Sequence, residues 1–124
     1  TRPLILVVDD SPSICQILKK ILTENGYRFI AVQNSFQALP MILKHKPDLV
    51  LLDLAMPVAN GYEVCAQIRR VSTFQSLPIV IVSGNDGMVD RVRARLVGAT
   101  GFLSKPFRPQ EVLETAGQYL NISS

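Results

Sequence analysis

Five polar residues that could do chemistry each lie where a run of aliphatic residues ends. They are Asp9, Asp10, Asp53, Ser83 and Lys105. A charge at the end of a buried strand is costly unless another group compensates it. Of these residues, Lys105 carries the opposite charge and could compensate the aspartates if the fold brings them together.

Three carboxylates at a shared edge would repel one another unless a cation lies between them. Mg²⁺, or Mn²⁺ in its place, suits such a site because it prefers oxygen ligands. The three negative charges, that ion and Lys105 sum to zero. A neutralised Asp53 can attack a phosphoryl group in line, while the cations and the Ser83 hydroxyl hold the phosphoryl oxygens. The predicted product is an aspartyl phosphate.

Taken alone, each residue has an ordinary structural interpretation. An aspartate at a strand end is commonly a helix cap or a turn residue, and Ser83 before Gly84 is a common turn start. Lys105 before Pro106 could be a solvated loop lysine. The chemical interpretation depends on the occurrence of these residues together at four strand ends.

Short aliphatic runs alternate five times with helical patterns. The predicted strands are residues 4–8, 29–32, 49–52, 79–82 and 102–103. Strands buried on both faces and alternating with helices predict an α/β fold, a doubly wound parallel sheet with helices on both sides. In such folds functional residues collect at the carboxyl ends of the strands.

Helix signals lie between these strands. Ser11 is the predicted N-cap of the first helix, with Pro12 in its first turn. Pro40 predicts that the second helix starts late or is kinked. The fourth helix is marked as amphipathic by Val89, Val92 and Leu96.

The composition describes one globular domain. The chain has 124 residues, of which 48% are hydrophobic, with no apolar run of the ~20 residues that a membrane helix needs and no signal-peptide pattern. We therefore expect a soluble cytoplasmic domain without a membrane partner. Cys15 and Cys65 lack metal-ligand spacing and are expected to be packed, reduced thiols.

The net charge of +3 raises the question of nucleic-acid binding. The basic residues are scattered, and of the three arginines in the fourth helix only Arg91 and Arg95 share a face. No aromatic residues interleave with them. We expect a solvated helix face and no direct binding of nucleic acid by this domain.

Five motifs carry a resemblance to a known family. They are "VVDDSP", "PDLVLLDLAMP", "NGYEV", "PIVIVSG" and "GATGFLSKPF". In their order and spacing the chain resembles a receiver domain of two-component response regulators, the superfamily of the single-domain chemotaxis regulator. The resemblance implies a flavodoxin-like (βα)5 domain over residues 1–124 with strand order 2-1-3-4-5. It also allows that the domain was excised from a longer regulator.

The resemblance implies a role for each site residue. Asp53 would be the phosphoacceptor, and a sensor histidine kinase or phosphotransfer protein the donor. Asp10, Asp53 and the Ala55 carbonyl would ligate Mg²⁺, with Asp9 acting through water. Lys105 would bind a phosphoryl oxygen. The Lys105–Pro106 bond is typically cis in this family.

The implied output is a switch. Ser83 would move to the phosphoryl group and Phe102 would turn inward behind it. These movements would remodel the face built from the fourth helix, fifth strand and fifth helix, which a downstream effector protein or output domain would read. Such a protein phosphorylates itself from phosphohistidine and dephosphorylates itself, and is not a turnover enzyme on an external substrate.

Some positions depart from the family pattern. Ala55 and Asn85 occupy the two places that tune the lifetime of the phosphoryl group, and both are small or neutral. Thr100 and Gly101 replace an acidic pair that joins dimer salt bridges in some relatives, which leaves at most a weak homodimer. The principal alternative is a pseudo-receiver, a protein-binding module that takes no phosphate.

Other enzyme classes fit less well. A phosphatase of the haloacid-dehalogenase type needs a second aspartate two positions after the first, and Ala55 cannot act as a general acid. A dinucleotide-binding protein needs Gly-x-Gly-x-x-Gly after the first strand, where this chain has "DDSPSI". A flavodoxin-like electron carrier needs a hydroxyl-rich or glycine-rich phosphate loop, and this chain does not have one.

Overall fold

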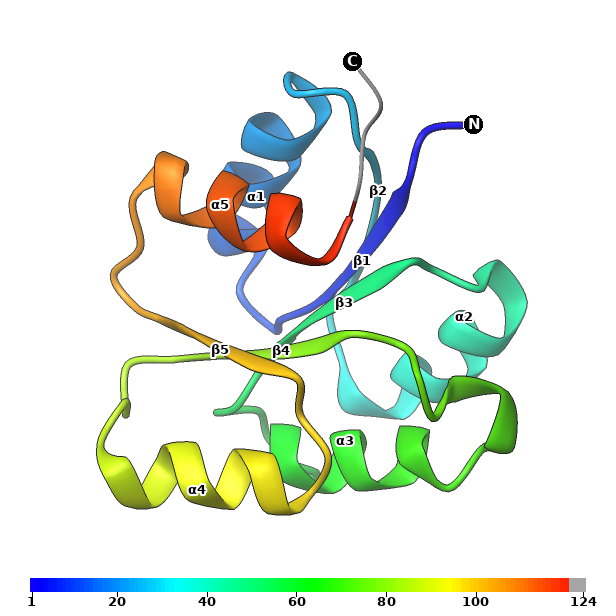
Figure 1. Ribbon diagram of the computed structural model, residues 1–124, viewed down its shortest axis with the longest axis vertical. Coiled ribbons are helices and arrows are strands. Elements are labelled where there is room, and N and C mark those ends of the chain that lie inside the picture. The colour runs from blue at the N-terminus through cyan, green and yellow to red at the C-terminus, as the bar shows by residue number, and fades with distance from the viewer. Residues whose placement is uncertain (121–124) are drawn as a thin grey trace.

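Each aliphatic run of the sequence forms a strand of one parallel sheet in the computed structural model, which describes residues 1–120 (Figure 1). The strands are β1 (Leu4–Val8), β2 (Arg28–Val32), β3 (Leu49–Asp53), β4 (Ile79–Ser83) and β5 (Gly101–Ser104). Their order is β2-β1-β3-β4-β5, as expected. Residues 121–124 of the expected domain lie outside the described residues.

Five helices cover the sheet in two layers (Figure 1). They are α1 (Pro12–Thr23), α2 (Ala38–His45), α3 (Gly61–Arg69), α4 (Met88–Leu96) and α5 (Pro109–Tyr119). Alternate strand residues point to opposite faces, so Leu6 and Val8 pack towards α2, α3 and α4, while Ile5 and Val7 pack towards α1 and α5. The doubly wound α/β prediction is confirmed.

β3 and β4 each extend one residue further towards the carboxyl end than predicted. Asp53 and Ser83 are the last residues of β3 and β4 and do not belong to the loops that follow. Both are almost completely buried, at 5% and 4% exposure. Strand hydrogen bonds therefore fix the backbone of both residues.

The helix starts follow the sequence signals. The Ser11 hydroxyl accepts a hydrogen bond from the N–H of Ile14 at 3.3 Å, and Pro12 opens α1. α2 starts late, at Ala38, after a 3₁₀ turn over Ser35–Gln37. Pro40 thus lies in the first turn of α2, where its missing N–H has no helical partner to lose.

Gly61 joins the end of β3 closely to the start of α3. Its N–H donates to the carbonyl of Leu54 at 2.9 Å. A Cβ atom at this position would lie 2.5 Å from the Asp53 carbonyl oxygen and 2.9 Å from the Leu54 Cα. Only glycine allows this approach, so Gly61 helps to fix the loop that follows Asp53.

The orientation of α4 differs from the one that the amphipathic pattern of its sequence indicates. The apolar residues that mark the helix face outwards: Val89 is 79% exposed, Val92 53% and Leu96 80%. The small Ala94 is instead the buried residue of this helix.

Polar and aromatic contacts hold α4 in place. The Arg93 guanidinium stacks over the Tyr62 ring at 4.4 Å. The Tyr62 hydroxyl donates to the Asp90 carbonyl at 3.1 Å. Periodicity located the helix but could not show which of its faces meets the protein.

No helix among residues 1–120 combines the length and apolar character needed to cross a bilayer.

Candidate functional site

The three acidic residues converge because β1 and β3 are neighbours. Val8 and Leu52 are paired in the sheet, which places the residues that follow them side by side. Carboxylate oxygens of Asp9, Asp10 and Asp53 all lie within 4.8 Å of one another. Asp9 and Asp53 are buried and Asp10 is exposed, so the cluster opens to solvent on one side.

Lys105 reaches this cluster from the loop after β5. Its Nζ donates to Asp53 Oδ1 at 3.0 Å and to Asp9 Oδ2 at 3.2 Å. The other oxygen of Asp9, Oδ1, accepts from the N–H of Ser11 at 2.9 Å. The Lys105–Pro106 bond is cis, as expected. One ammonium thus holds two of the three carboxylates.

Burial and neighbouring charges shift the pKa values of both Asp53 and Lys105. Burial raises the pKa of the Asp53 carboxyl, the Lys105 hydrogen bond opposes that rise, and the charges of Asp9 and Asp10 add to it. Burial alone would lower the pKa of the Lys105 ammonium, but the hydrogen bonds and charges of Asp53 and Asp9 raise it above its usual value. The cluster as it stands has more negative charge than its lysine balances.

Ser83 lies at the end of β4, beside β3 in the sheet. Asp53 pairs with Val82, so Ser83 is one residue beyond the carboxylate in register. Its Oγ accepts a hydrogen bond from the Asn85 N–H at 3.0 Å. Ala55 and Asn85, predicted to tune the phosphoryl lifetime, are both exposed in the loops after β3 and β4.

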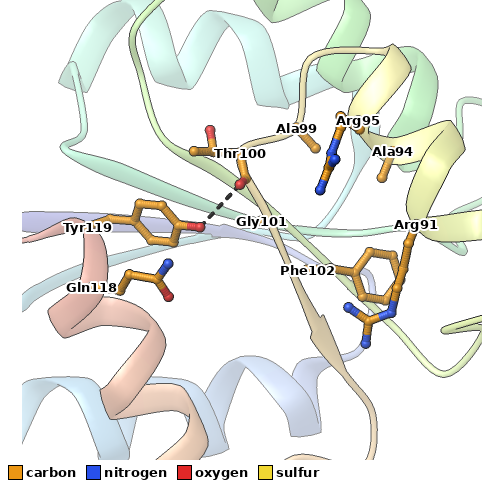
Figure 2. Close-up of a pocket in the computed structure, with 9 residues that line it drawn as sticks. All are labelled: Arg91, Ala94, Arg95, Ala99, Thr100, Gly101, Phe102, Gln118 and Tyr119. Atoms are coloured by element: carbon orange, nitrogen blue, oxygen red, sulfur yellow. Dashed lines mark hydrogen bonds between the residues drawn. The ribbon is translucent and has the colours of Figure 1, made fainter. Parts of the chain in front are cut away.

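Phe102 lies on β5 beneath α4, partly buried against the core on that side of the sheet. The Arg91 guanidinium stacks on its ring at 4.8 Å, as Figure 2 shows. Arg91 also donates to the Asp86 carbonyl at 3.0 Å and to the Ser104 hydroxyl at 3.2 Å. The Ser104 hydroxyl in turn donates to Asp86 Oδ2 at 2.9 Å.

A family model for the response regulator receiver domain matches residues 5–116. The chain belongs to this family. Receiver domains act in two-component systems, where phosphorylation controls signalling.

Similar proteins differ in how much of their length the receiver occupies. Protein PilG of Pseudomonas aeruginosa is 35% identical over 109 residues, which are 88% of this chain and 81% of PilG. Response regulator MprA of Mycobacterium sp. (strain KMS) is 40% identical over 88% of this chain but only 46% of its own length. The receiver thus spans about half of MprA.

The same fold is found in solved receivers. The chemotaxis protein CheY4 of Vibrio cholerae has a TM-score of 0.93 and 32% identity, and the likeness covers 97% of this chain and 100% of that chain. The receiver domain of a Francisella response regulator has a TM-score of 0.87 at 25% identity over 95% of this chain and 96% of that one.

The acidic cluster of this receiver fits the Mg²⁺ that the family typically binds. Hard carboxylate oxygens are the ligands Mg²⁺ prefers. Lys105 neutralises one of the three charges of Asp9, Asp10 and Asp53, so the residual charge of two matches a divalent ion. The donors present and their charge both suit the metal.

The sequence did not predict the contacts around Arg91. The sequence predicts a solvated helix face for Arg91, yet its guanidinium covers Phe102 and reaches Ser104. Only the pairing of α4 with β5 brings these residues together. An arginine eleven positions before a strand aromatic is a signal too weak to recognise without the fold.

The two cysteines are free and buried, as expected. Cys15 Sγ donates to the Asp9 carbonyl at 3.4 Å, and Cys65 Sγ to the Val97 carbonyl at 3.5 Å. Burial raises the pKa of the Cys65 thiol to about 11, with Arg69 acting weakly against it. Both thiols therefore serve packing.

Proposed function

We propose that this receiver accepts a phosphoryl group on Asp53 from the phosphohistidine of a sensor kinase or phosphotransfer protein. The observation that carries the proposal is the buried carboxylate of Asp53 at the end of β3, which meets Lys105 at 3.0 Å and two further carboxylates. Strand and loop contacts hold Asp53 in one position, so little ordering is needed at the moment of reaction.

Phosphoryl transfer to Asp53 would form one bond to phosphorus and break another. A carboxylate oxygen of Asp53 forms a bond to phosphorus, the bond from phosphorus to the donor imidazole nitrogen breaks, and that nitrogen keeps the electron pair and is later protonated. Because Lys105 holds Oδ1, we assign the attack to Oδ2. The Lys105 ammonium would then bind a phosphoryl oxygen.

Asp10, Asp53 and the Ala55 carbonyl would hold Mg²⁺, with Asp9 acting through water. When bound, the ion neutralises charge on the phosphoryl oxygens. Asp9 also has a role of its own, because its contact with Lys105 positions the ammonium between β1 and β3.

The response would pass from Ser83 through Phe102 to α4. Movement of the Ser83 hydroxyl to the phosphoryl group would break its bond to the Asn85 N–H. Inward movement of Phe102 would remove the ring on which Arg91 stacks. The loop before α4 and the helix itself would then rearrange together.

Signal decay would be a property of the same site. A water molecule would attack the aspartyl phosphate and release inorganic phosphate. With Ala55 and Asn85 at the two positions beside it, we expect this water to be poorly screened and also poorly oriented. We therefore describe a protein that phosphorylates and dephosphorylates itself in the cytoplasm and controls an effector protein or an output domain joined to residues 1–124.

The test is Mg²⁺-dependent phosphorylation by a small phosphodonor. Incubation with acetyl phosphate and Mg²⁺, followed by intact mass spectrometry, should add one phosphoryl group to the wild type. Asp53→Asn and chelation of the metal should each abolish this addition. Lys105→Met should slow it by roughly 100-fold, whereas Lys44→Met, at an exposed lysine on α2, should not change it.

Absence of a Mg²⁺-dependent phosphoryl group on wild-type protein would contradict the proposal. It would favour the pseudo-receiver, a binding module that keeps the fold without the chemistry. Equal rates in Lys105→Met and Lys44→Met would contradict the role given to the ammonium alone.

A further inference from the structure

Arg69, the half-buried last residue of α3, ties this helix to two other segments. Its Nε donates to the Gly98 carbonyl at 2.8 Å, directly after α4. Its Nη1 donates to the Phe74 carbonyl at 2.6 Å, in the 3₁₀ turn Ser72–Phe74. Its Nη2 donates to the Thr100 hydroxyl at 3.2 Å. A guanidinium presents its donors in a rigid fork, so one side chain fixes these carbonyls relative to one another.

The C-terminal end of α4 is a closed turn that packs on Arg69. The Gly98 N–H donates to the Arg95 carbonyl and the Ala99 N–H to the Ala94 carbonyl, both at 3.0 Å. This is the Schellman pattern, with Gly98 at a φ of +96°. A Cβ atom on Gly98 would lie 2.8 Å from Arg69 Cγ. The guanidinium thus lies beside the last carbonyls of α4, where the helix dipole favours a cation.

This end of α4 is also bonded to the sheet and to α5 through Thr100. The Thr100 N–H donates to the Ile79 carbonyl at 2.7 Å, and the Thr100 hydroxyl accepts from the Ile79 N–H at 3.1 Å. The Tyr119 hydroxyl of α5 donates to the Thr100 carbonyl at 3.2 Å, as Figure 2 shows. The connection from α4 to β5 is therefore held from three sides.

Weaker contacts hold the opposite end of α4. Its N-cap is Gly87, which has no side chain to accept from the first turn. The Tyr62 hydroxyl gives one neutral hydrogen bond to the Asp90 carbonyl, and the hydrogen bonds of Arg91 are exposed to solvent. Neutral bonds are weaker than those of a partly buried guanidinium. This weaker end is also the one that follows Ser83 in the chain.

We propose that Arg69 makes the C-terminal end of α4 the fixed end of a hinge, so that the helix swings at the end next to Ser83. Arg91 lies about 9 Å along the helix from Val97, so an outward swing of about 10° would move Arg91 by about 1.5 Å. That would break its 3.2 Å hydrogen bond to Ser104 and keep those of Arg69. The inference rests on the proposed function only for phosphorylation as the cause of the swing.

Amide hydrogen exchange in the unmodified protein tests the anchor. The amides of Ala99 and Thr100 should exchange roughly tenfold more slowly than that of Arg91, which bonds to the Gly87 carbonyl at the weaker end. Arg69→Met removes all three guanidinium hydrogen bonds. It should accelerate exchange at Ala99 and Thr100 by about 10–100-fold and leave the Arg91 amide unchanged.

Two variants serve as controls for Arg69→Met. Arg70→Met removes the exposed arginine that follows in the chain and should leave all these exchange rates unchanged. Arg69→Lys keeps the positive charge but replaces the fork by one ammonium, which cannot reach all the acceptors. Its acceleration should be intermediate. Circular dichroism checks the fold, and Arg69→Lys carries the comparison if Arg69→Met does not fold.

Residual dipolar couplings of backbone amides test the swing. They are measured by NMR with Mg²⁺, before and after addition of beryllofluoride, which mimics a phosphoryl group on an aspartate. In wild type the couplings should report a change of about 10° in the direction of α4, with those of residues 98–100 unchanged. In Arg69→Met the couplings of residues 98–100 should change as well.

Three results would contradict the hinge. Equal exchange rates at the two ends of α4 in wild type would overturn the anchor. So would Ala99 and Thr100 amides that exchange equally in Arg69→Met and Arg70→Met. Wild-type couplings that change at residues 98–100 as much as along α4 would overturn the swing. A protein that does not respond to beryllofluoride would remove only the proposed function, because the exchange comparison needs no phosphoryl group.

Discussion

Replacing Gly61 by alanine tests the junction that holds Asp53 in place. The new Cβ would lie 2.5 Å from the Asp53 carbonyl oxygen, about 1 Å short of the 3.4 Å at which ordinary contact begins. It would also lie 2.9 Å from the Leu54 Cα. Because both neighbours are backbone atoms, the start of α3 must move away from β3.

Such overpacking costs about 1–3 kcal/mol of unfolding free energy. For a domain of this size, that corresponds to a melting temperature lowered by roughly 3–15 °C. Phosphorylation of Asp53 should also slow, because its carbonyl and the following loop are displaced.

Gly117→Ala provides a matched control. Gly117 lies within α5, and a Cβ there meets no atom within 4 Å. Alanine in a helix interior should therefore raise stability by about 1 kcal/mol. Urea unfolding followed by circular dichroism measures both variants. A Gly61→Ala variant as stable as wild type, or shifted in the same direction as Gly117→Ala, would refute the close junction.

Three further predictions concern α3, α4 and the core. Burial raises the pKa of the Cys65 thiol from its ordinary 9.0 to about 11 in the folded protein. The stability that the neutral thiol contributes is therefore complete below pH 9 and is lost as the pH rises to 11. The difference in unfolding free energy between wild type and Cys65→Ala should narrow over this window by about 3 kcal/mol. Tyr62→Phe should lose about 1 kcal/mol in urea unfolding, since one hydrogen bond to Asp90 disappears; no loss would mean that this bond does not anchor α4. Arg91→Ala should uncover the Phe102 ring and increase its flipping rate in NMR spectra, and an unchanged rate would show that the guanidinium does not restrain it.

The sequence predicts the site better than it predicts the surface around it. Parallel strands end at one edge of the sheet, so residues at strand ends such as Asp53 and Ser83 must approach one another once the strand order is known. The order itself came from the family resemblance, and the structure confirms it.

α4 shows why the remainder could not be predicted. The spacing of its apolar residues predicts the helix but not its orientation. The small Ala94 packs on the protein, while Arg91 stacks on Phe102 and Arg93 stacks on Tyr62. Stacking of arginine on an aromatic ring depends on tertiary neighbours, and no local pattern records it.

The central claim is that Asp53 is the residue that carries the phosphoryl group. Borohydride converts an aspartyl phosphate to homoserine, so reduction after treatment with acetyl phosphate and Mg²⁺, followed by peptide mass spectrometry, identifies the modified position. We predict homoserine at residue 53 and unmodified Asp9 and Asp10. Homoserine at either of the other two aspartates, or at none of them, would contradict the account.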